Sequence, residues 1–373
     1  MKNVFGILNL HDGPSLGELT EEHPLGSISF LGRYGLMDFA LSNLTNSGVD
    51  RIAILIEKNS HSIRSHLQGG NIWISNTKTG NLGEYLNEKV LSTPSYNTDI
   101  ANLRDSLSPI DRQIVEDYVL IVPPHFVMCL DFNEVVENHI ASGSDITIVY
   151  SPRKDAKKEF INSDTLSFDK DGNVISIEKN KGDSSAANIS LETYVINKSK
   201  LVEIVNLASK KSKTATLRSM ISSLVEEGKI IVKGYAYHDL VLPITSLQNY
   251  VKYSFMLLKE EYSNLLFKKD WPIYTTTHNT APTIYGKNAE VSNSFIANGS
   301  RINGKVENSI ISRNVVVEEG AYVKDSIIFT KTSIASGSKV KYILAGKHVD
   351  IRNKKNVSGT KEEILFINYG AKI

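Results

Sequence analysis

The chain of 373 residues carries 42 lysines and arginines against 41 aspartates and glutamates, a formal net charge of +1, and one cysteine, Cys129. This balance gives no reason to expect nucleic acid or an anionic membrane as a partner. One cysteine excludes an intrachain disulfide, and no stretch approaches the roughly 20 apolar residues of a membrane span. The first residues lack the features of a signal peptide, so we expect a cytoplasmic protein.

The first two-thirds of the chain alternates the patterns of strands and helices. Short apolar runs predict buried strands at Val4–Leu8, Arg51–Ile56, Tyr118–Pro123 and Asp145–Tyr150. Helical spacing of apolar residues predicts helices at 36–44, 61–67 and 132–143, and a longer one at 246–268. Asp171-Gly172, between two apolar runs, predicts a hairpin turn. The alternation predicts a parallel sheet with helices on both faces.

The last part of the chain carries a six-residue period. Aliphatic or aromatic residues fall six apart at Ile310, Val316, Tyr322, Ile328, Ile334 and Val340. Two places before each stands a small or turn-prone residue, from Asn308 to Ser338. A hexapeptide repeat of this kind predicts a left-handed parallel β-helix, with one of these side chains per step in its interior.

Several segments resemble a known family. FLGRYGLMDFALSNLTNSGVDRIAILIEKNSHSIRSH, from Phe30 to His66, resembles the second motif region of bacterial ADP-glucose pyrophosphorylases, also called glucose-1-phosphate adenylyltransferases. DWPIYTT, from Asp270 to Thr276, resembles that family's linker, and IEKN, from Ile177 to Asn180, its sugar-phosphate segment. The resemblance covers nearly the whole chain in the family's order. Within the family it is strongest to the non-catalytic D-type subunit found beside a catalytic C-type subunit.

The resemblance implies an α/β fold followed by coils. We expect a Rossmann-like nucleotidyltransferase-type domain over residues 1–244, a helical linker over 245–283 and a left-handed β-helix domain over 284–373. The family's reaction joins glucose 1-phosphate to the α-phosphate of ATP and releases pyrophosphate in glycogen synthesis. It requires the triphosphate to be held in line and its charge to be neutralised. A glycine-rich turn, basic residues and two Mg²⁺-binding aspartates do this.

The glycine-rich turn is degenerate here. Its remnant is Leu10, His11, Asp12 and Gly13, followed by Pro14. Proline has no backbone N–H to donate to a phosphate. Asp12 would place a negative charge where the phosphate should lie, and no arginine remains in the loop.

The other catalytic positions of the family are also lost. Leu25 stands at the lysine position, Pro124 at the first metal aspartate and Pro243 at the second. The adenine-side segment is recognisable only at 97–101. We therefore expect no catalytic residue, no metal and no cofactor, with Mg²⁺ bound only if activity survives. Asp131 and Asp239 lie near the lost metal positions, and a shifted alignment could restore one of them.

Two basic residues remain as binding candidates. Lys179 matches the lysine that contacts the sugar phosphate in active relatives, and Arg33 falls near a lysine tied to activator binding in some relatives. Each also fits a solvated surface cation. His61 and His66 lie on one predicted helix without a third ligand, which indicates a solvated helical face rather than a metal site.

Three functions are compatible with these features. The favoured one is a regulatory or structural subunit that binds a catalytic ADP-glucose pyrophosphorylase subunit in a homo- or hetero-oligomer, with a small sugar phosphate or nucleotide as effector. The second is a divergent but active sugar-phosphate nucleotidyltransferase. The third is an acyltransferase, a class to which hexapeptide coils often belong. It would need a catalytic histidine on a coil, and His348, at the end of the repeats, is the only histidine near them.

Overall fold

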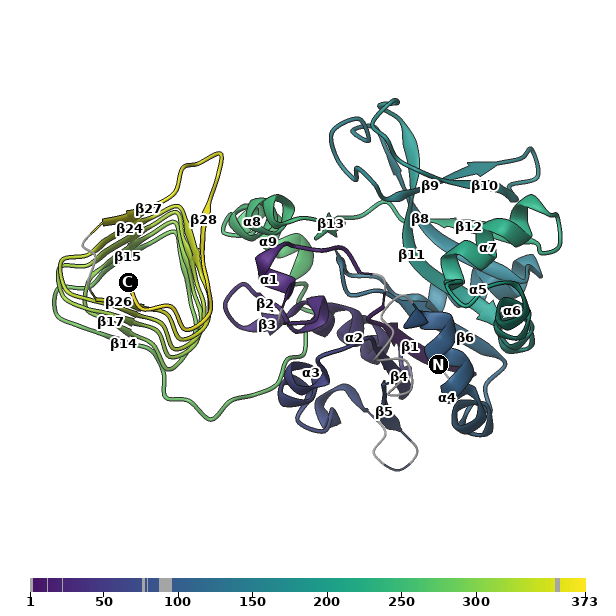
Figure 1. The fold of residues 1–373 in the computed structure, drawn as a ribbon, viewed down its shortest axis with the longest axis horizontal. Coiled ribbons are helices and arrows are strands. Elements are labelled where there is room, and N and C mark those ends of the chain that lie inside the picture. Colours follow the sequence, from purple (N-terminus) through teal and green to yellow (C-terminus); the bar gives the residue numbers. More distant parts are fainter. Residues whose placement is uncertain are drawn as a thin grey trace.

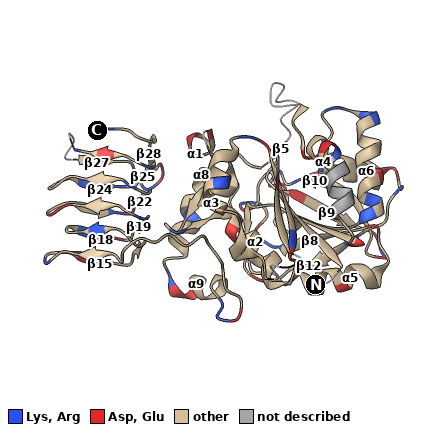
Figure 2. Ribbon diagram, turned by 90° about the horizontal axis from the view of Figure 1, so that it is seen from below, with Lys and Arg blue, Asp and Glu red and all other residues tan. Residues whose placement is uncertain are grey.

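The computed structural model describes residues 3–11, 13–21, 23–75, 78, 80–86, 96–352 and 356–373, with 107–113 described by their backbone alone. Figure 1 shows an α/β part and a stack of triangular coils, with a short helical segment between them. Lysines and arginines are interspersed with aspartates and glutamates over both parts (Figure 2). The two-part α/β and hexapeptide-coil architecture predicted from the sequence is confirmed.

The α/β part is built on a mixed sheet, in which nine strands belong to the described residues. Its parallel strands, in the order β6-β1-β4-β5, are β6 (Tyr118–Val122), β1 (Val4–Asn9), β4 (Arg51–Ile56) and β5 (Asn81–Leu86). On the other side lie β11 (Ala187–Asn197), β8 (Ile146–Arg153), β12 (Val232–Ala236), β9 (Asp164–Phe168) and β10 (Val174–Lys179). β11 runs antiparallel to β6, β8 and β9, so the predicted all-parallel sheet is wrong there. An apolar run indicates burial but not strand direction.

Helices cover both faces of this sheet, as predicted. They are α2 (Leu36–Asn46), α3 (Ser60–Leu67), α4 (Asp99–Gln113), α5 (Phe132–Ser142), α6 (Lys198–Lys211) and α7 (Leu217–Glu226). The short α1 (Glu18–Glu21) instead buries Leu19 in the core between the α/β part and the coils. One core, including Leu41, Ile63 and Val135, packs α2, α3 and α5 against one face. A second core, including Leu103 and Met220, packs α4, α6 and α7 against the other. The hairpin at Asp171-Gly172 joins β9 and β10 as expected.

Short elements connect the sheet to the coils. They are the single turns η1 (Leu25–Ser27) and η2 (Asn71–Trp73), the pair β2 (Ser29–Phe30) and β3 (Tyr34–Gly35), the pair β7 (Phe126–Val127) and β13 (Leu242–Pro243), and the helices α8 (Leu247–Met256) and α9 (Glu260–Leu266). The predicted single helix over 246–268 is therefore two helices, because the chain leaves helical geometry after Leu257. Ser246 caps α8 by accepting a hydrogen bond from the Asn249 N–H at 3.1 Å.

The coils form three parallel sheets, each with five strands in the described residues. The first contains β14 (Ile284–Tyr285), β17 (Arg301–Ile302), β20 (Val316–Val317), β23 (Ser333–Ile334) and β26 (Asp350–Ile351). The second contains β15 (Glu290–Ser292), β18 (Lys305–Glu307), β21 (Tyr322–Lys324), β24 (Lys339–Lys341) and β27 (Asn356–Ser358). The third contains β16 (Phe295–Ile296), β19 (Ile310–Ile311), β22 (Ile327–Ile328), β25 (Ile343–Ala345) and β28 (Leu365–Ile367). Each coil thus contributes one short strand to each wall.

The predicted interior register is right for the second half of the repeat and wrong by one residue for the first. The interior side chains form one apolar cluster that includes Ile302, Val306, Ile311, Val317, Val323, Ile328, Ile334, Val340, Ala345 and Ile351. Ile310 instead packs toward the α/β part, and Val316 and Tyr322 are only half-buried. Ile311, Ile328 and Ala345 are aligned in neighbouring strands, which makes a coil 17 residues long. From Ile311 the interior residues of this coil are Val317, Val323 and Ile328, at steps of six, six and five residues. A repeat counted in unbroken steps of six is therefore shifted by one residue on one side of the five-residue corner.

Ile328→Asp tests the coil interior. Ile328 is fully buried between aligned interior residues, so an unpaired carboxylate there should lower the free energy of unfolding by about 3–5 kcal/mol. Thermal unfolding followed by circular dichroism should show a lower transition temperature for the variant. Size-exclusion chromatography should show a larger hydrodynamic size if the C-terminal coils unfold. Ile175→Asp is the matched control, because Ile175 is half-exposed on β10. Equal transition temperatures for the two variants would contradict the interior assignment.

Candidate functional site

Two adjoining cavities lie beyond the carboxyl ends of β1 and β6, where open α/β sheets bind their ligands. They have volumes of about 280 and 270 Å³. The first is lined by Asn9, His11, Asp99, Pro123, Lys179, Glu192, Tyr194, Thr216, Leu217 and Arg218. The second is lined by Pro14, His125, Ile161, Asn162, Ser163, Lys179, Glu192 and Thr245. Lys179 and Glu192 border both, so we treat the pair as one site.

The turn after β1 uses its polar groups internally. The Leu10 N–H donates to the Leu55 carbonyl at 3.0 Å, the His11 N–H to Asn9 Oδ1 at 3.0 Å, and the Leu16 N–H to Thr20 Oγ1 at 2.9 Å. A phosphate-binding turn must instead aim such N–H groups at its ligand. Asp12 lies outside the described residues. These bonds leave the turn poorly suited to hold a triphosphate.

The His11 imidazole fills space at the end of β1. Its side chain is buried, and its Nε2 accepts a hydrogen bond from Asn102 Nδ2 at 3.0 Å. Asn102 also donates to the Tyr85 carbonyl at 3.0 Å, which ties α4 to the end of β5. Burial lowers the pKa of His11 to about 4, so the ring is neutral at pH 7. The ring therefore contributes packing and one acceptor to this end of the sheet, without positive charge.

Pro124 and Pro243, the residues predicted to stand at the two metal-aspartate positions, lie on neighbouring segments. β13 pairs with β7 so that Pro243 faces Phe126, two residues after Pro124, and the Ile244 N–H donates to the His125 carbonyl at 2.8 Å. Neither proline side chain can coordinate a cation. In the described part of the chain, no group of three or more His, Cys, Asp or Glu side chains is placed to hold a metal ion.

Asp131 and Asp239, the alternative metal candidates, have other partners. Asp131 caps α5 by accepting from the Asn133 N–H at 2.9 Å. Asp239 is exposed and pairs with Lys268 at 3.3 Å. Neither is among the described residues that line the two cavities. Leu25, at the lysine position, is buried, and it packs close to Gly13 of the turn.

Lys179 is brought into the site, but it shares a carboxylate with a second cation. Its Nζ lies 2.9 Å from Oδ1 of Asp164, which is almost fully buried on β9. Arg218, at the start of α7, holds the same carboxylate through its Nε and Nη2, the latter at 2.6 Å from Oδ1. Sequence reasoning missed Asp164 and Arg218, because β9 and α7 meet only in the folded chain.

Asp99 links two helices beneath the first cavity. Its Oδ1 accepts from the Ile100 N–H at 2.7 Å and the Leu217 N–H at 3.0 Å, and its Oδ2 accepts from Asn9 Nδ2 at 3.1 Å. Burial raises its pKa, and these hydrogen bonds oppose that effect. The carboxylate lies at the first turns of α4 and α7, where the helix dipoles favour negative charge. The remnant of the adenine-side segment thus includes a residue that joins two helices.

Glu192 is the second acidic residue at the site and was not identified from the sequence. It lies on β11 at a bulge between Ser190 and Thr193, with a φ of 49°. Its Oε2 lies 3.4 Å from Nε2 of His125. Burial, with a smaller effect of the Lys179 charge, lowers the pKa of His125 to about 3, so His125 is neutral at pH 7. A buried imidazole and a carboxylate therefore meet where the two cavities join.

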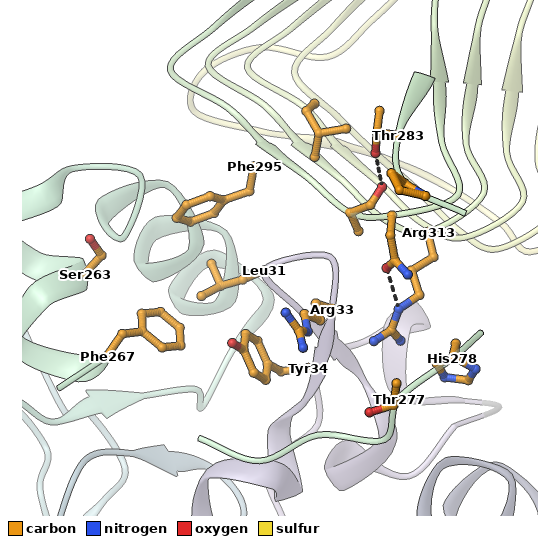
Figure 3. Close-up of a pocket in the computed structure, with 14 residues that line it drawn as sticks. Leu31, Arg33, Tyr34, Ser263, Phe267, Thr277, His278, Thr283, Phe295 and Arg313 are labelled. Atoms are coloured by element: carbon orange, nitrogen blue, oxygen red, sulfur yellow. Dashed lines mark hydrogen bonds between the residues drawn. The ribbon is translucent and has the colours of Figure 1, made fainter. Parts of the chain in front are cut away.

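A larger cavity of about 720 Å³ lies between the α/β part, the helical segment and the coils. Figure 3 shows Arg33 and Arg313 side by side in it, with Leu31, Phe267 and Phe295 on the opposite wall. No aspartate or glutamate is among the described residues that line it. Burial, followed by the positive charge of Arg33, lowers the pKa of Arg313. Two neighbouring guanidinium groups without a carboxylate between them favour an anionic ligand.

Arg313 is held in place from both sides of this cavity. Its Nε donates to Asn298 Oδ1 at 3.3 Å and its Nη2 to the Thr276 carbonyl at 3.4 Å. The structure brings it to Arg33, the effector candidate, although 280 residues separate them in the chain. Nothing in the repeat pattern distinguishes Arg313 from other coil residues. It could be found only once the coils were placed against β2 and β3.

The expectation of a solvated face for both histidines of α3 is wrong for one of them. His61 is exposed, but the His66 ring is largely buried and its Nε2 lies 2.7 Å from Oδ1 of the fully buried Asp38. The other oxygen of Asp38 accepts from the Gly35 N–H at 2.8 Å. The His66 carbonyl also accepts from Thr276 Oγ1 of the linker. His66 therefore connects α2, α3 and the linker.

Comparison with known proteins follows the same two-part division. Residues 12–239 match the nucleotidyl transferase family model, and residues 279–363 match the GlmU-like C-terminal hexapeptide model. The glycogen biosynthesis protein GlgD of Bacillus subtilis (strain 168) is 27% identical over 356 residues, 95% of this chain and 92% of that protein. The chain belongs to the ADP-glucose pyrophosphorylase family.

Other members of the ADP-glucose pyrophosphorylase family align over similar lengths. Glucose-1-phosphate adenylyltransferase of Fervidobacterium nodosum is 27% identical over 340 residues, 90% of this chain and 80% of that protein. The enzyme of the same name from Clostridium perfringens (strain 13 / Type A) is 26% identical over 335 residues, 88% of this chain and 83% of that protein. Within the described residues, no helix has the length and apolar character to span a membrane.

The buried histidines of the site predict a pH-dependent stability. His125 has an ordinary pKa near 6.5 when unfolded and about 3 in the fold, so the unfolded chain binds the proton first as pH falls. The contribution of neutral His125 to the free energy of unfolding is complete above about pH 6.5. Between pH 6.5 and pH 3 this contribution falls by up to about 1.4 kcal/mol per pH unit. His125→Asn should flatten urea-denaturation stability between pH 6.5 and 4 relative to wild type. His61→Asn is the matched surface control, and equal slopes for wild type and His125→Asn would refute the prediction.

Proposed function

We propose that this chain is a regulatory or structural subunit of glucose-1-phosphate adenylyltransferase in glycogen biosynthesis. In this proposal it binds a catalytic subunit of the same family and does not itself make ADP-glucose. The observation that carries the proposal is the pair of prolines where the family alignment expects metal-binding aspartates, Pro124 just before β7 and Pro243 on β13, which pairs with β7. The similarity to GlgD over nearly the full length of both chains supports it.

The chemistry of adenylyl transfer explains why these replacements matter. Transfer to glucose 1-phosphate requires Mg²⁺ to screen the triphosphate oxygens and stabilise the leaving pyrophosphate. Losing one metal-holding carboxylate removes several kcal/mol of transition-state stabilisation. The turn after β1 adds to this loss, since the N–H groups of His11 and Leu16 donate to side chains of the protein. Lys179 retains its charge but shares Asp164 with Arg218.

Regulation would use the large cavity between the two parts. We assign Arg33 and Arg313 as the anion-binding pair for a small sugar phosphate or nucleotide effector, with Leu31, Phe267 and Phe295 as the apolar wall. A ligand there would touch the α/β part, the helical segment and the coils together. It would change activity only if it bound one arrangement of these parts better than another.

Assembly would use the first end of the coil stack. β14, β15 and β16 each form the outer edge of one wall sheet in the described residues. Ile284, Tyr285 and Val291 on these strands expose 55%, 53% and 38% of their surfaces. At the opposite end the C-terminal residues cover the last coil, with the Asp350 N–H donating to the Ala371 carbonyl at 2.8 Å. Exposed strand edges and apolar side chains suit pairing with a homologous coil.

The first expectation is that the purified chain synthesises no ADP-glucose. Because metal, loop and lysine positions are replaced together, its turnover with ATP, glucose 1-phosphate and Mg²⁺ should lie more than about a hundredfold below that of an intact relative. Pyrophosphate release is the measurement. Turnover above that limit that disappears in Asp131→Asn or Asp239→Asn would show that the metal positions were misassigned.

The second expectation is a complex with a catalytic relative. Light scattering of the mixed proteins should show a larger species, and the partner's apparent affinity or turnover should change about 5- to 150-fold, equivalent to about 1–3 kcal/mol of coupling. Ile284→Asp should weaken the complex by placing a charge on the exposed coil end. Ile140→Asp is the control, because Ile140 is a half-exposed residue of α5 in the α/β part, away from the coils. No complex at micromolar concentration, together with unchanged kinetics, would reject the subunit proposal.

A further inference from the structure

Glu192 adopts a backbone conformation that a glutamate has little reason to adopt. Its φ of 49° lies in the left-handed region, which glycine occupies without cost and other residues rarely enter. The bulge between Ser190 and Thr193 produces this conformation within β11. Strained residues held in place by their surroundings concentrate at functional sites. Here the bulge places the Glu192 carboxylate at the boundary between the two cavities.

The charges at the site are balanced by the protein itself. Lys179 and Arg218 supply two positive charges, and Asp164, which both contact, supplies one negative charge. Glu192 supplies the second negative charge, at the wall it shares with Lys179. Asp99 is turned toward the first turns of α4 and α7, whose N–H groups and dipoles compensate it. Among the described residues that line the two cavities, no positive charge is left over for a phosphate ligand.

We propose that Glu192 is a built-in occupant of the anion subsite, which keeps phosphate monoesters of sugar size out of this cavity. This subsite is the part of the two cavities around Lys179, with Arg218 lining the first cavity and His125 the second. A sugar phosphate entering the cavity would place its dianion against the Glu192 carboxylate, and like charges in such proximity oppose binding. Removing the carboxylate leaves one positive charge in excess and opens space beside Lys179. This inference deepens the proposed function, on which it rests, by naming what closes the site.

Glycine is the most informative replacement. Glu192→Gly removes the carboxylate and suits the left-handed backbone, so the fold should be retained. Glu192→Gln removes the charge but keeps most of the side-chain volume. Comparison of the two variants therefore distinguishes electrostatic repulsion of the ligand phosphate from steric filling of the cavity. Glu137→Gln is the matched control, because Glu137 is exposed on α5 and is not among the described residues lining either cavity. Circular dichroism and thermal unfolding check that each variant is folded.

Isothermal titration of the isolated chain with glucose 1-phosphate tests the proposal, with inorganic phosphate and glucose as separate titrants. Glu192→Gly should bind glucose 1-phosphate at least about tenfold more tightly than wild type or Glu137→Gln, with Glu192→Gln intermediate. For inorganic phosphate, the affinities of the variants should follow the same order with smaller differences. For neutral glucose, the affinities of all variants and the wild type should be equal. Lys179→Ala added to Glu192→Gly should abolish the gain, which locates binding at this subsite.

The outcomes are decisive in both directions. Equal affinity in wild type and Glu192→Gly, or no binding by either folded Glu192 variant, overturns the proposal. A gain that survives Lys179→Ala also overturns it, because the ligand would then bind elsewhere. The titration requires no partner and no turnover, so it can fail while the mixed complex forms. The complex can likewise be absent while the Glu192 variants gain binding.

Discussion

The packing of one coil wall against the α/β part is the contact on which the rest of the molecule depends. Ile310, Ile327 and Leu344 lie in successive coils, point out of the stack and are fully buried. They belong to one apolar core with residues of α8, α9 and the β2–β3 hairpin. Burying three such side chains contributes several kcal/mol, at about 1.5–3 kcal/mol each. This core fixes the coils on the nucleotidyltransferase part.

The cavity with the two arginines is a consequence of that packing. Arg33 lies beside the hairpin and Arg313 on a coil corner, so their separation is set by how the coils sit on the α/β part. Hydrogen bonds from Arg313 to Asn298 and Thr276 hold its side chain to both coil and linker. A ligand between the arginines would bias the position of the coils, and with it any partner bound at the exposed coil end. Such coupling requires different contacts in two arrangements.

The polar side chains around the two small cavities bond mainly to other groups of the protein. Asn102 donates to His11 Nε2, Asp164 pairs with two cations, and Asp99 joins α4 to α7. A polar group buried without a partner costs free energy, and these internal bonds avoid that cost for the groups they join.

The sequence by itself determined the alternation of strands and helices, the helices on both faces of the sheet and the coil repeat. These follow from local periodicity and from residue identity, which a chain carries without folding. The tertiary structure alone decided that β11 runs antiparallel to its neighbours and that one corner of a 17-residue coil is five residues long. It also decided that Glu192 reaches the two small cavities and Arg313 the large one. Strand direction and cavity walls depend on contacts between segments far apart in sequence, and no local pattern encodes such contacts.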